Sequence, residues 1–121
     1  MKLTLQQLID AKSCTQQVDL FRSLFGDSVE VTEESCVAVF DKFDWNFAAR
    51  NFLTPAALAE YERVRAAAWD ECVRVTAPAW AECVRGTAPA RAEYDRVAAP
   101  AWVEYYRVTA AAFGRLYSEG D

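Results

Sequence analysis

The chain has 121 residues, of which 53% are hydrophobic and 26% are charged, with four glycines and four prolines. This composition is typical of a folded globular protein and excludes wholesale disorder. The formal net charge of −5 argues against a nucleic-acid-binding protein, whose affinity depends on basic contacts to phosphates. The four cysteines show no Cys-x-x-Cys spacing and the chain has no histidine, so we expect neither a metal nor a cofactor.

The sequence predicts no targeting or membrane segment. Residues 1–12 mix apolar and polar side chains and include Lys2, Asp10 and Lys12, so they lack the apolar region of a signal peptide. No run reaches the length of about 18 apolar residues that a bilayer requires. We therefore expect a cytoplasmic protein, in which the cysteines stay reduced.

An acidic helical module is predicted over residues 1–53, which hold eight acidic and five basic side chains. Residue types that cap helices divide it into four short helices, with capping boxes at Thr4 with Gln7 and at Ser13 with Gln16, a helix-ending Gly26, and N-caps at Thr32 and Asp44. A brief extended stretch at residues 29–31 is too short to predict a sheet. The aromatic side chains of the module are expected to form its core, because a small domain needs much apolar area to offset chain entropy.

The acidic side chains of this module leave two interpretations open. Glu33 and Glu34 follow the predicted N-cap at Thr32, where acids interact favourably with the helix dipole. Together with the other acids they form either a solvated face or a docking patch for a basic partner. The candidate interaction residues in the module are Asp27, Glu30, Glu33 and Glu34.

An array of 11-residue repeats follows over residues 54–117, with residues 118–121 as a short tail. Five near-copies begin at Leu58 and a partial sixth begins at Phe113. The copies read LAEYERVRAAA, WDECVRVTAPA, WAECVRGTAPA, RAEYDRVAAPA and WVEYYRVTAAA. Eleven residues make three helical turns at about 3.67 residues per turn, so each repeat position stays on one face of a helix.

Numbering the repeat positions one to eleven separates an apolar stripe from a charged face. Positions one, four and seven hold mostly Trp, Tyr and Val, and they share one side of a helix. Positions three and six are Glu and Arg in all five copies, which predicts i,i+3 ion pairs that support the surface rather than acid–base catalysis. The candidate interaction residues in the stripe are Trp69, Trp80, Trp102, Tyr94 and Tyr105.

Repeat position ten holds Pro78, Pro89 and Pro100, and proline kinks or breaks a helix. The stripe keeps its phase across every proline, so we favour one long kinked helix over several short ones. The predicted fold class is therefore all-α, a small helical module plus an amphipathic repeat array kinked or broken at these prolines. A straight helix over residues 58–117 would be roughly 90 Å long. Its stripe must fold back on itself, pack along the module or pair with another chain; a continuous helix predicts self-association and a broken one a compact monomer.

Several copies depart from the common residue of their position. Cys72 and Cys83 replace Tyr, Arg91 replaces Trp, and Gly86 replaces Val. Glycine weakens the helix at that point, and the arginine puts a charge onto the apolar stripe. This tolerance of substitutions suits a spacer or a broad surface better than an active site.

The segments VDLFRSLFGDSVEVTEESC and FDWNFAARNFL, followed by AEYERVRAAAW-type repeats, resemble a group of phage and prophage proteins. Those proteins share a similar short N-terminal segment and variable numbers of such repeats. The resemblance covers nearly the whole chain and implies a bacteriophage or bacterial setting. It carries over no activity and no site residue, and the Cys and Arg replacements depart from the usual Tyr and Trp.

The sequence favours a non-enzymatic protein-binding or scaffolding protein that binds a protein partner or itself. One alternative, drawn from the phage setting, is an inhibitor of a bacterial defence complex, of the anti-CRISPR type. Another is a lipid-surface protein, because proline-punctuated 11-residue repeats are similar to those of exchangeable apolipoproteins, although membrane-surface helices usually offer more basic residues. An enzyme is not expected, because the chain offers no histidine, Gly-rich phosphate loop or nucleophile elbow.

Overall fold

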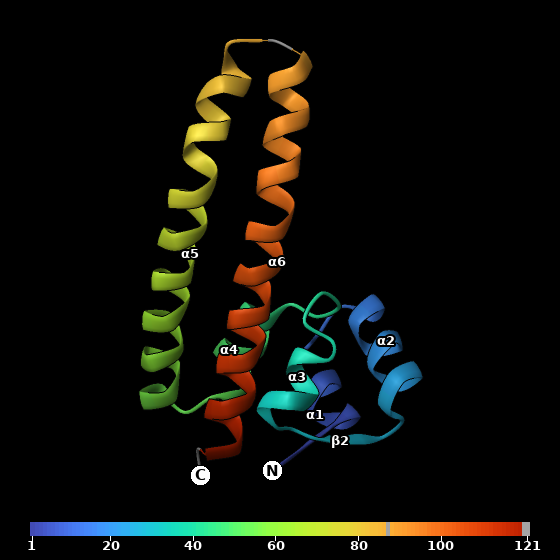
Figure 1. Ribbon diagram of the computed structural model, residues 1–121. Coiled ribbons are helices and arrows are strands. Elements are labelled where there is room, and N and C mark those ends of the chain that lie inside the picture. The colour runs from blue at the N-terminus through green and yellow to red at the C-terminus, as the bar shows by residue number, and fades with distance from the viewer. Residues whose placement is uncertain (87, 120–121) are drawn as a thin grey trace.

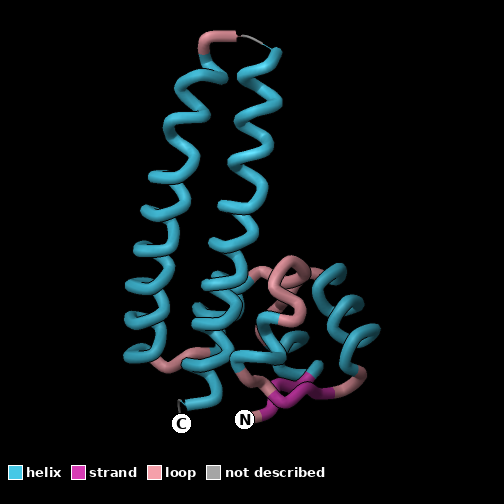
Figure 2. Tube along the Cα trace, viewed as in Figure 1, coloured by secondary structure: helices cyan, strands magenta, loops and turns pink. Residues whose placement is uncertain are grey.

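The computed structural model describes residues 1–86 and 88–119, most of which are helical (Figure 1, Figure 2). The elements in chain order are β1 (Lys2–Thr4), α1 (Leu5–Asp10), α2 (Thr15–Phe25), β2 (Ser28–Glu30), α3 (Glu33–Val37), α4 (Trp45–Phe52), α5 (Pro55–Val84) and α6 (Ala88–Glu119). The prediction of an all-α fold is confirmed, and two short strands are added to it. Figure 1 shows α5 and α6 side by side, with the smaller elements gathered beside the base of α6. None of the described helices has a stretch long and apolar enough to cross a membrane.

Most of the predicted helix caps are confirmed. Thr4 and Gln7 form a reciprocal capping box on α1, and Gly26 closes α2 with φ +72°. Thr32 caps α3, and the Asp44 carboxylate accepts a hydrogen bond from the Phe47 amide at 3.1 Å at the start of α4. The side chains of Thr4, Thr32 and Asp44 each satisfy a backbone amide that the helix itself leaves unpaired, so the starts of these helices could be read from single residues.

The capping box predicted at Ser13 is wrong. α2 begins at Thr15, and Cys14 occupies the N-cap position without a side-chain hydrogen bond. The reason lies in the preceding turn, where Lys12 has φ +62° and the Ser13 amide donates to the Leu8 carbonyl at 3.1 Å. Ser13 therefore still belongs to the reversal that ends α1.

The extended stretch at residues 29–31 does form a sheet, which the sequence analysis did not predict. β2 pairs with β1 in an antiparallel ladder that aligns Leu3 with Val29. Strands of three residues are not stable alone, but here tertiary packing covers them. Leu3 and Val31 are buried, and the Tyr117 hydroxyl of α6 donates to the Lys2 carbonyl at 2.8 Å.

The repeat array forms a helical hairpin of two long helices. The predicted continuity through Pro78 and Pro100 is confirmed, whereas one unbroken helix over the whole array is wrong. Within the described residues the array breaks after Arg85, where Gly86 adopts φ +82°. Glycine reaches this left-handed region without the steric cost of a Cβ. The other four complete repeats have Val at this position. α5 continues through Pro78 and α6 through Pro100, and Pro89 is the second residue of α6, where proline is well tolerated because first-turn amides have no intrahelical acceptor.

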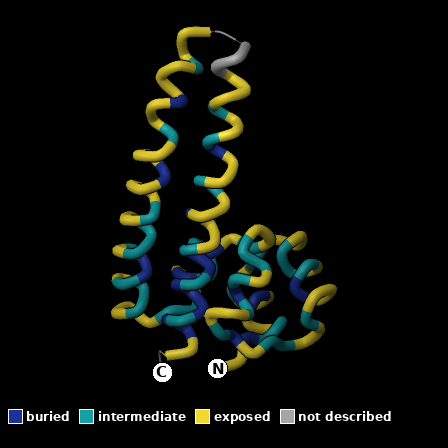
Figure 3. The backbone as a smooth tube through the Cα atoms, viewed as in Figure 1, coloured by how far each residue is buried: buried dark blue, intermediate teal, exposed yellow. Residues whose placement is uncertain are grey.

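One hydrophobic core joins the module to the base of the hairpin. Phe113, Leu116 and Tyr117 of α6 pack with Trp45 and the other buried residues of the module. Figure 3 shows that the buried segments concentrate at this base, whereas most of the hairpin further up is exposed. Ser118 and Glu119 of the expected tail lie in α6, and residues 120–121 are outside the described part.

Candidate interaction surfaces

The two helices of the hairpin pair in a register set by the repeat. Trp69 of α5 packs on Tyr105 of α6 with ring centroids 5.6 Å apart, and Trp80 packs on Tyr94 at 5.2 Å. A step of 11 residues up α5 is thus matched by 11 residues down α6, so repeat position one faces position four across the hairpin. The structure therefore brings together the predicted stripe residues, with Trp102 lying 5.2 Å from Trp69.

The same register explains what the tyrosine-to-cysteine replacements do. It places Cys72 opposite Trp102, where a tyrosine would otherwise fill the space between the helices. Cys72 is buried, and that burial raises the pKa of its thiol. Beside it an open groove of about 440 Å³ runs between α5 and α6. The smaller side chain thus leaves the hairpin less completely packed at its middle.

We call this feature the alanine groove. All of the lining residues come from the hairpin, with small or aliphatic side chains on the floor and charged ones at the rim. Val75 is 37% exposed. The lining residues are Arg63, Val64, Ala67, Ala68, Glu71, Cys72, Val75, Ala101, Glu104, Tyr105 and Val108.

A second apolar surface, the aromatic strip, runs along the other broad face of the hairpin. Its members are Trp69, Val73, Trp80, Val84 and Tyr106, all of which are exposed. The four residues on α5 fall within about 60° of one another around the helix. Trp80 is 55% exposed although one side of it packs on Tyr94. Val73 and Val75 are about 200° apart around α5, which places the strip and the groove on opposite faces.

The strip includes residues that sequence reasoning missed. Val73, Val84 and Tyr106 occupy repeat position five, which holds Glu62 and Asp95 in the other two copies. A comparison of position five across the copies would have found them, because it is apolar in some copies and charged in others. Tyr106 also borders a cleft of about 280 Å³ beside Phe43 and Trp45, so the strip continues down to the module.

The predicted ion pairs along the array are confirmed. Arg63 contacts Glu60 at 2.5 Å, Arg74 contacts Glu71 at 2.5 Å, and Arg107 contacts Glu104 at 2.7 Å, with matching pairs at Glu82–Arg85 and Glu93–Arg96. The hydrogen bond from each arginine lowers the carboxylate pKa of Glu60, Glu71, Glu93 and Glu104. These pairs are exposed, so each contributes little to stability, and each pair carries no net charge.

The acidic candidates lie apart from the aromatic ones. Asp27, Glu30, Glu33 and Glu34 are all exposed, and Glu33 and Glu34 occupy the first turn of α3. Glu30 accepts a hydrogen bond from the amino group of Met1 at 2.8 Å, and this contact lowers its carboxyl pKa. Figure 1 shows β2 at the base of the module, away from the tip of the hairpin, so the structure does not combine the two groups into one surface.

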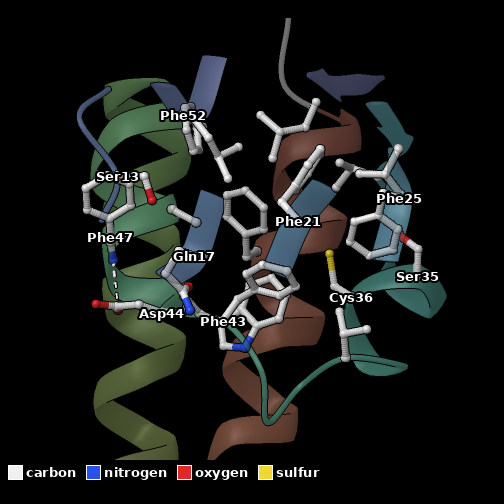
Figure 4. Close-up of a pocket in the computed structure, with 18 residues that line it drawn as sticks. Ser13, Gln17, Phe21, Phe25, Ser35, Cys36, Phe43, Asp44, Phe47 and Phe52 are labelled. Carbon is white, nitrogen blue, oxygen red and sulfur yellow. Dashed lines mark hydrogen bonds between the residues drawn. The ribbon is translucent and has the colours of Figure 1, made fainter. Parts of the chain in front are cut away.

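A small cavity lies inside the module (Figure 4). It measures about 60 Å³ and is lined mainly by apolar side chains, including the aromatic Phe21, Phe25, Phe43 and Phe113. Engineered apolar cavities that bind benzene are larger, at about 150 Å³. Asp44 at its edge already caps α4. The cavity is therefore a gap in core packing, and within the described residues no cluster of three or more His, Cys, Asp or Glu side chains could hold a metal ion.

Comparisons of the chain with models of protein families, with curated proteins and with solved structures find no match.

Proposed function

We propose that the protein is a non-enzymatic protein-binding protein, and that it holds its partner against the aromatic strip. The observation that carries this proposal is the exposure of two tryptophans, a tyrosine and two valines along one face of a helical hairpin. Apolar patches of this kind mark interaction sites on soluble proteins. Trp and Tyr also dominate the residues that contribute most to binding energy at protein interfaces.

The chemistry of the strip supports binding rather than catalysis. Its side chains are indoles, a phenol and isopropyl groups, and the cleft at its lower end is likewise lined by aromatic side chains together with Asp44, Asn46 and Thr109. The rings are held by packing on each other, as in Trp69 against Trp102 and Trp80 against Tyr94. Such pre-arranged aromatic side chains lose little conformational entropy on binding. The resemblance to phage proteins makes the cytoplasm of a bacterial host the proposed place of action.

Site-specific photo-crosslinking tests this proposal. A photoreactive amino acid at Trp80 should crosslink the protein to one discrete host protein in a bacterial lysate, identified by mass spectrometry. The matched control is Arg74, which is exposed on the same helix but lies on its outer face. Equal crosslinking from both positions, or crosslinking to lipid vesicles instead of protein, would contradict the proposal.

A substitution measures the contribution of the strip once the partner is purified. We expect Trp80→Ala to weaken binding by at least about tenfold, since truncating a tryptophan that dominates an interface typically costs about 2 kcal/mol or more. Arg74→Ala should leave the affinity within about twofold, because it lies off the strip. Circular dichroism of both variants should match the original chain, because Trp80 packs near the hairpin tip and away from the core.

A further inference from the structure

The alanine groove on the opposite face of the hairpin is a second surface that the proposed function does not use. Its floor is made of Val64, Ala68, Val75, Ala101 and Val108, and its rim carries charged side chains from both helices. Ala67 and Ala68 lie close to the middle of α5, which spans Pro55–Val84. Small side chains at the middle of a helix face allow another helix to approach closely.

A broken array alone predicts a compact monomer, but the groove face stays uncovered after the array folds back on itself. We infer that this groove is the interface between two copies of the chain, which pair face to face in an antiparallel arrangement. A two-fold axis crossing α5 near Ala67 lays α5 on α5 of the second copy and α6 on α6, which makes a four-helix bundle. The interface is self-complementary, as a closed two-fold dimer requires. This inference is independent of the aromatic strip, which stays exposed on the outside of the dimer.

The charged side chains of the groove favour a second copy of the chain as the partner, and they favour its antiparallel orientation. The groove is lined by Arg63 together with Glu71 and Glu104, so each copy offers charges of both signs that can pair with a second copy. With the axis near Ala67, Arg63 of one copy lies opposite Glu71 of the other, and the contact occurs twice. The antiparallel direction also keeps the two acidic modules at opposite ends, whereas a parallel pair would bring them together.

The available area is sufficient for a stable dimer. A helix of 30 residues is about 45 Å long at 1.5 Å per residue. Two such helices side by side, about 9 Å apart, present a face of roughly 800 Å². Standard protein–protein interfaces bury about 800 Å² on each partner. The hairpin face therefore matches the size that a specific dimer requires.

Two valines of α5 provide a matched test. Val75 is 37% exposed in the groove, and Val73 is 43% exposed on the aromatic strip. Sedimentation equilibrium of the original chain should give twice the 13.6 kDa monomer mass. Val75→Glu should weaken the dimer at least about tenfold, while Val73→Glu should leave it intact, and circular dichroism should show both variants folded.

Charge exchange tests the antiparallel arrangement. Arg63→Glu alone and Glu71→Arg alone should each weaken the dimer, because each places like charges opposite one another across the interface. The double variant Arg63→Glu with Glu71→Arg should restore it. A structural role within one chain would give no such rescue, because each residue pairs with a different neighbour there, Arg63 with Glu60 and Glu71 with Arg74.

The outcomes separate this inference from the proposed function. A monomeric original chain at all concentrations, or dissociation caused by Val73→Glu rather than Val75→Glu, overturns the groove interface. Loss of partner crosslinking in Val73→Glu with retention in Val75→Glu supports the aromatic strip whatever the mass turns out to be. Weakening by both single charge changes without rescue overturns the antiparallel direction.

Discussion

Packing changes the acidity of individual side chains in the core, and the thiol of Cys36 is the clearest case. It lies on α3, buried where α6 packs against the module, and burial raises the pKa of its thiol to about 11. Cys14, in contrast, is exposed at the start of α2. The sequence predicted reduced thiols but could not rank them, because burial arises from contacts between residues far apart in the chain.

The buried thiol makes stability depend on alkaline pH. In the unfolded chain a cysteine ionises near pH ~8.5, and the fold favours the protonated form because its pKa is about 11. The stability that this difference in pKa contributes is therefore complete below pH ~8.5 and is lost as the pH rises through 11, with a total of roughly 3 kcal/mol. Urea unfolding at pH 7 and pH 10.5 should show this loss.

The control for this prediction is Cys36→Ala. Other groups, including the buried Tyr61 whose pKa is also raised by burial, titrate in both proteins and cancel in the comparison. The variant should start less stable at pH 7, since truncation leaves a small cavity, and should then lose less stability on going to pH 10.5. Parallel losses in the two proteins would show that Cys36 does not carry the effect.

At the scale of elements, the contact between α6 and α3 depends on a glycine. A Cβ atom at Gly114 would lie 2.4 Å from the Thr32 carbonyl oxygen and 2.9 Å from Cys36 Sγ. The two helices can approach this closely only because residue 114 has no side chain. Gly114 interrupts the repeat just after Phe113, and the sequence alone gives no reason for it, because the residue it faces is more than 80 positions away along the chain.

We predict that Gly114→Ala destabilises the protein by about 1–3 kcal/mol, the usual cost of overpacking a core. The sign of this change in stability tests the close packing, because replacing glycine with alanine inside a helix otherwise stabilises a protein by up to about 1 kcal/mol. Thermal unfolding followed by circular dichroism measures it. Ala110→Gly on the same helix is a useful comparison, since it lowers helix propensity without adding an atom. An unchanged or raised melting temperature in Gly114→Ala would contradict the close α3–α6 packing.

The sequence predicted the elements better than their pairing. Helix caps at Thr4, Thr32 and Asp44 are local signals, and the structure confirms them. The strand pair depends on residues that are distant along the chain. The wrong cap at Ser13 results from the tight turn that ends α1. The predicted stripe residues of α5 and α6 meet across the hairpin. The aromatic strip also includes repeat position five, and both the strip and the groove exist only because the array folds back on itself.

At the scale of the whole molecule, the fold depends on where the array breaks. The prolines were the obvious candidates, yet α5 and α6 run through Pro78 and Pro100. Proline removes one hydrogen bond and still permits a helix, whereas a reversal requires a residue with positive φ. Gly86 is such a residue, and a break there leaves arms of 30 and 32 residues that can pair along their whole length. Two arms of nearly equal length bury the most apolar surface when they pair. The chain therefore reverses at Gly86 rather than at a proline.

Restoring the repeat at this position should therefore change the architecture. Valine at φ +82° would carry a left-handed strain of about 1–2 kcal/mol, and it would also restore the common residue of repeat position seven. We predict that Gly86→Val favours a continuous helix through the former turn, so that α5 of one copy pairs with α6 of another in a domain-swapped dimer. Small-angle X-ray scattering should show a particle much longer than the original chain.

Two further variants identify the cause of that change. Gly86→Asn should keep the hairpin, because asparagine tolerates the left-handed region. Combining Gly86→Val with Val75→Glu should leave the swapped dimer intact, because swapping reuses the contacts between α5 and α6, including Trp69 with Tyr105, and does not need the groove. An elongated particle in both Gly86→Val and Gly86→Asn would mean that the loss of glycine alone opens the hairpin. A compact Gly86→Val would mean that the paired arms, rather than the turn, set the position of the break.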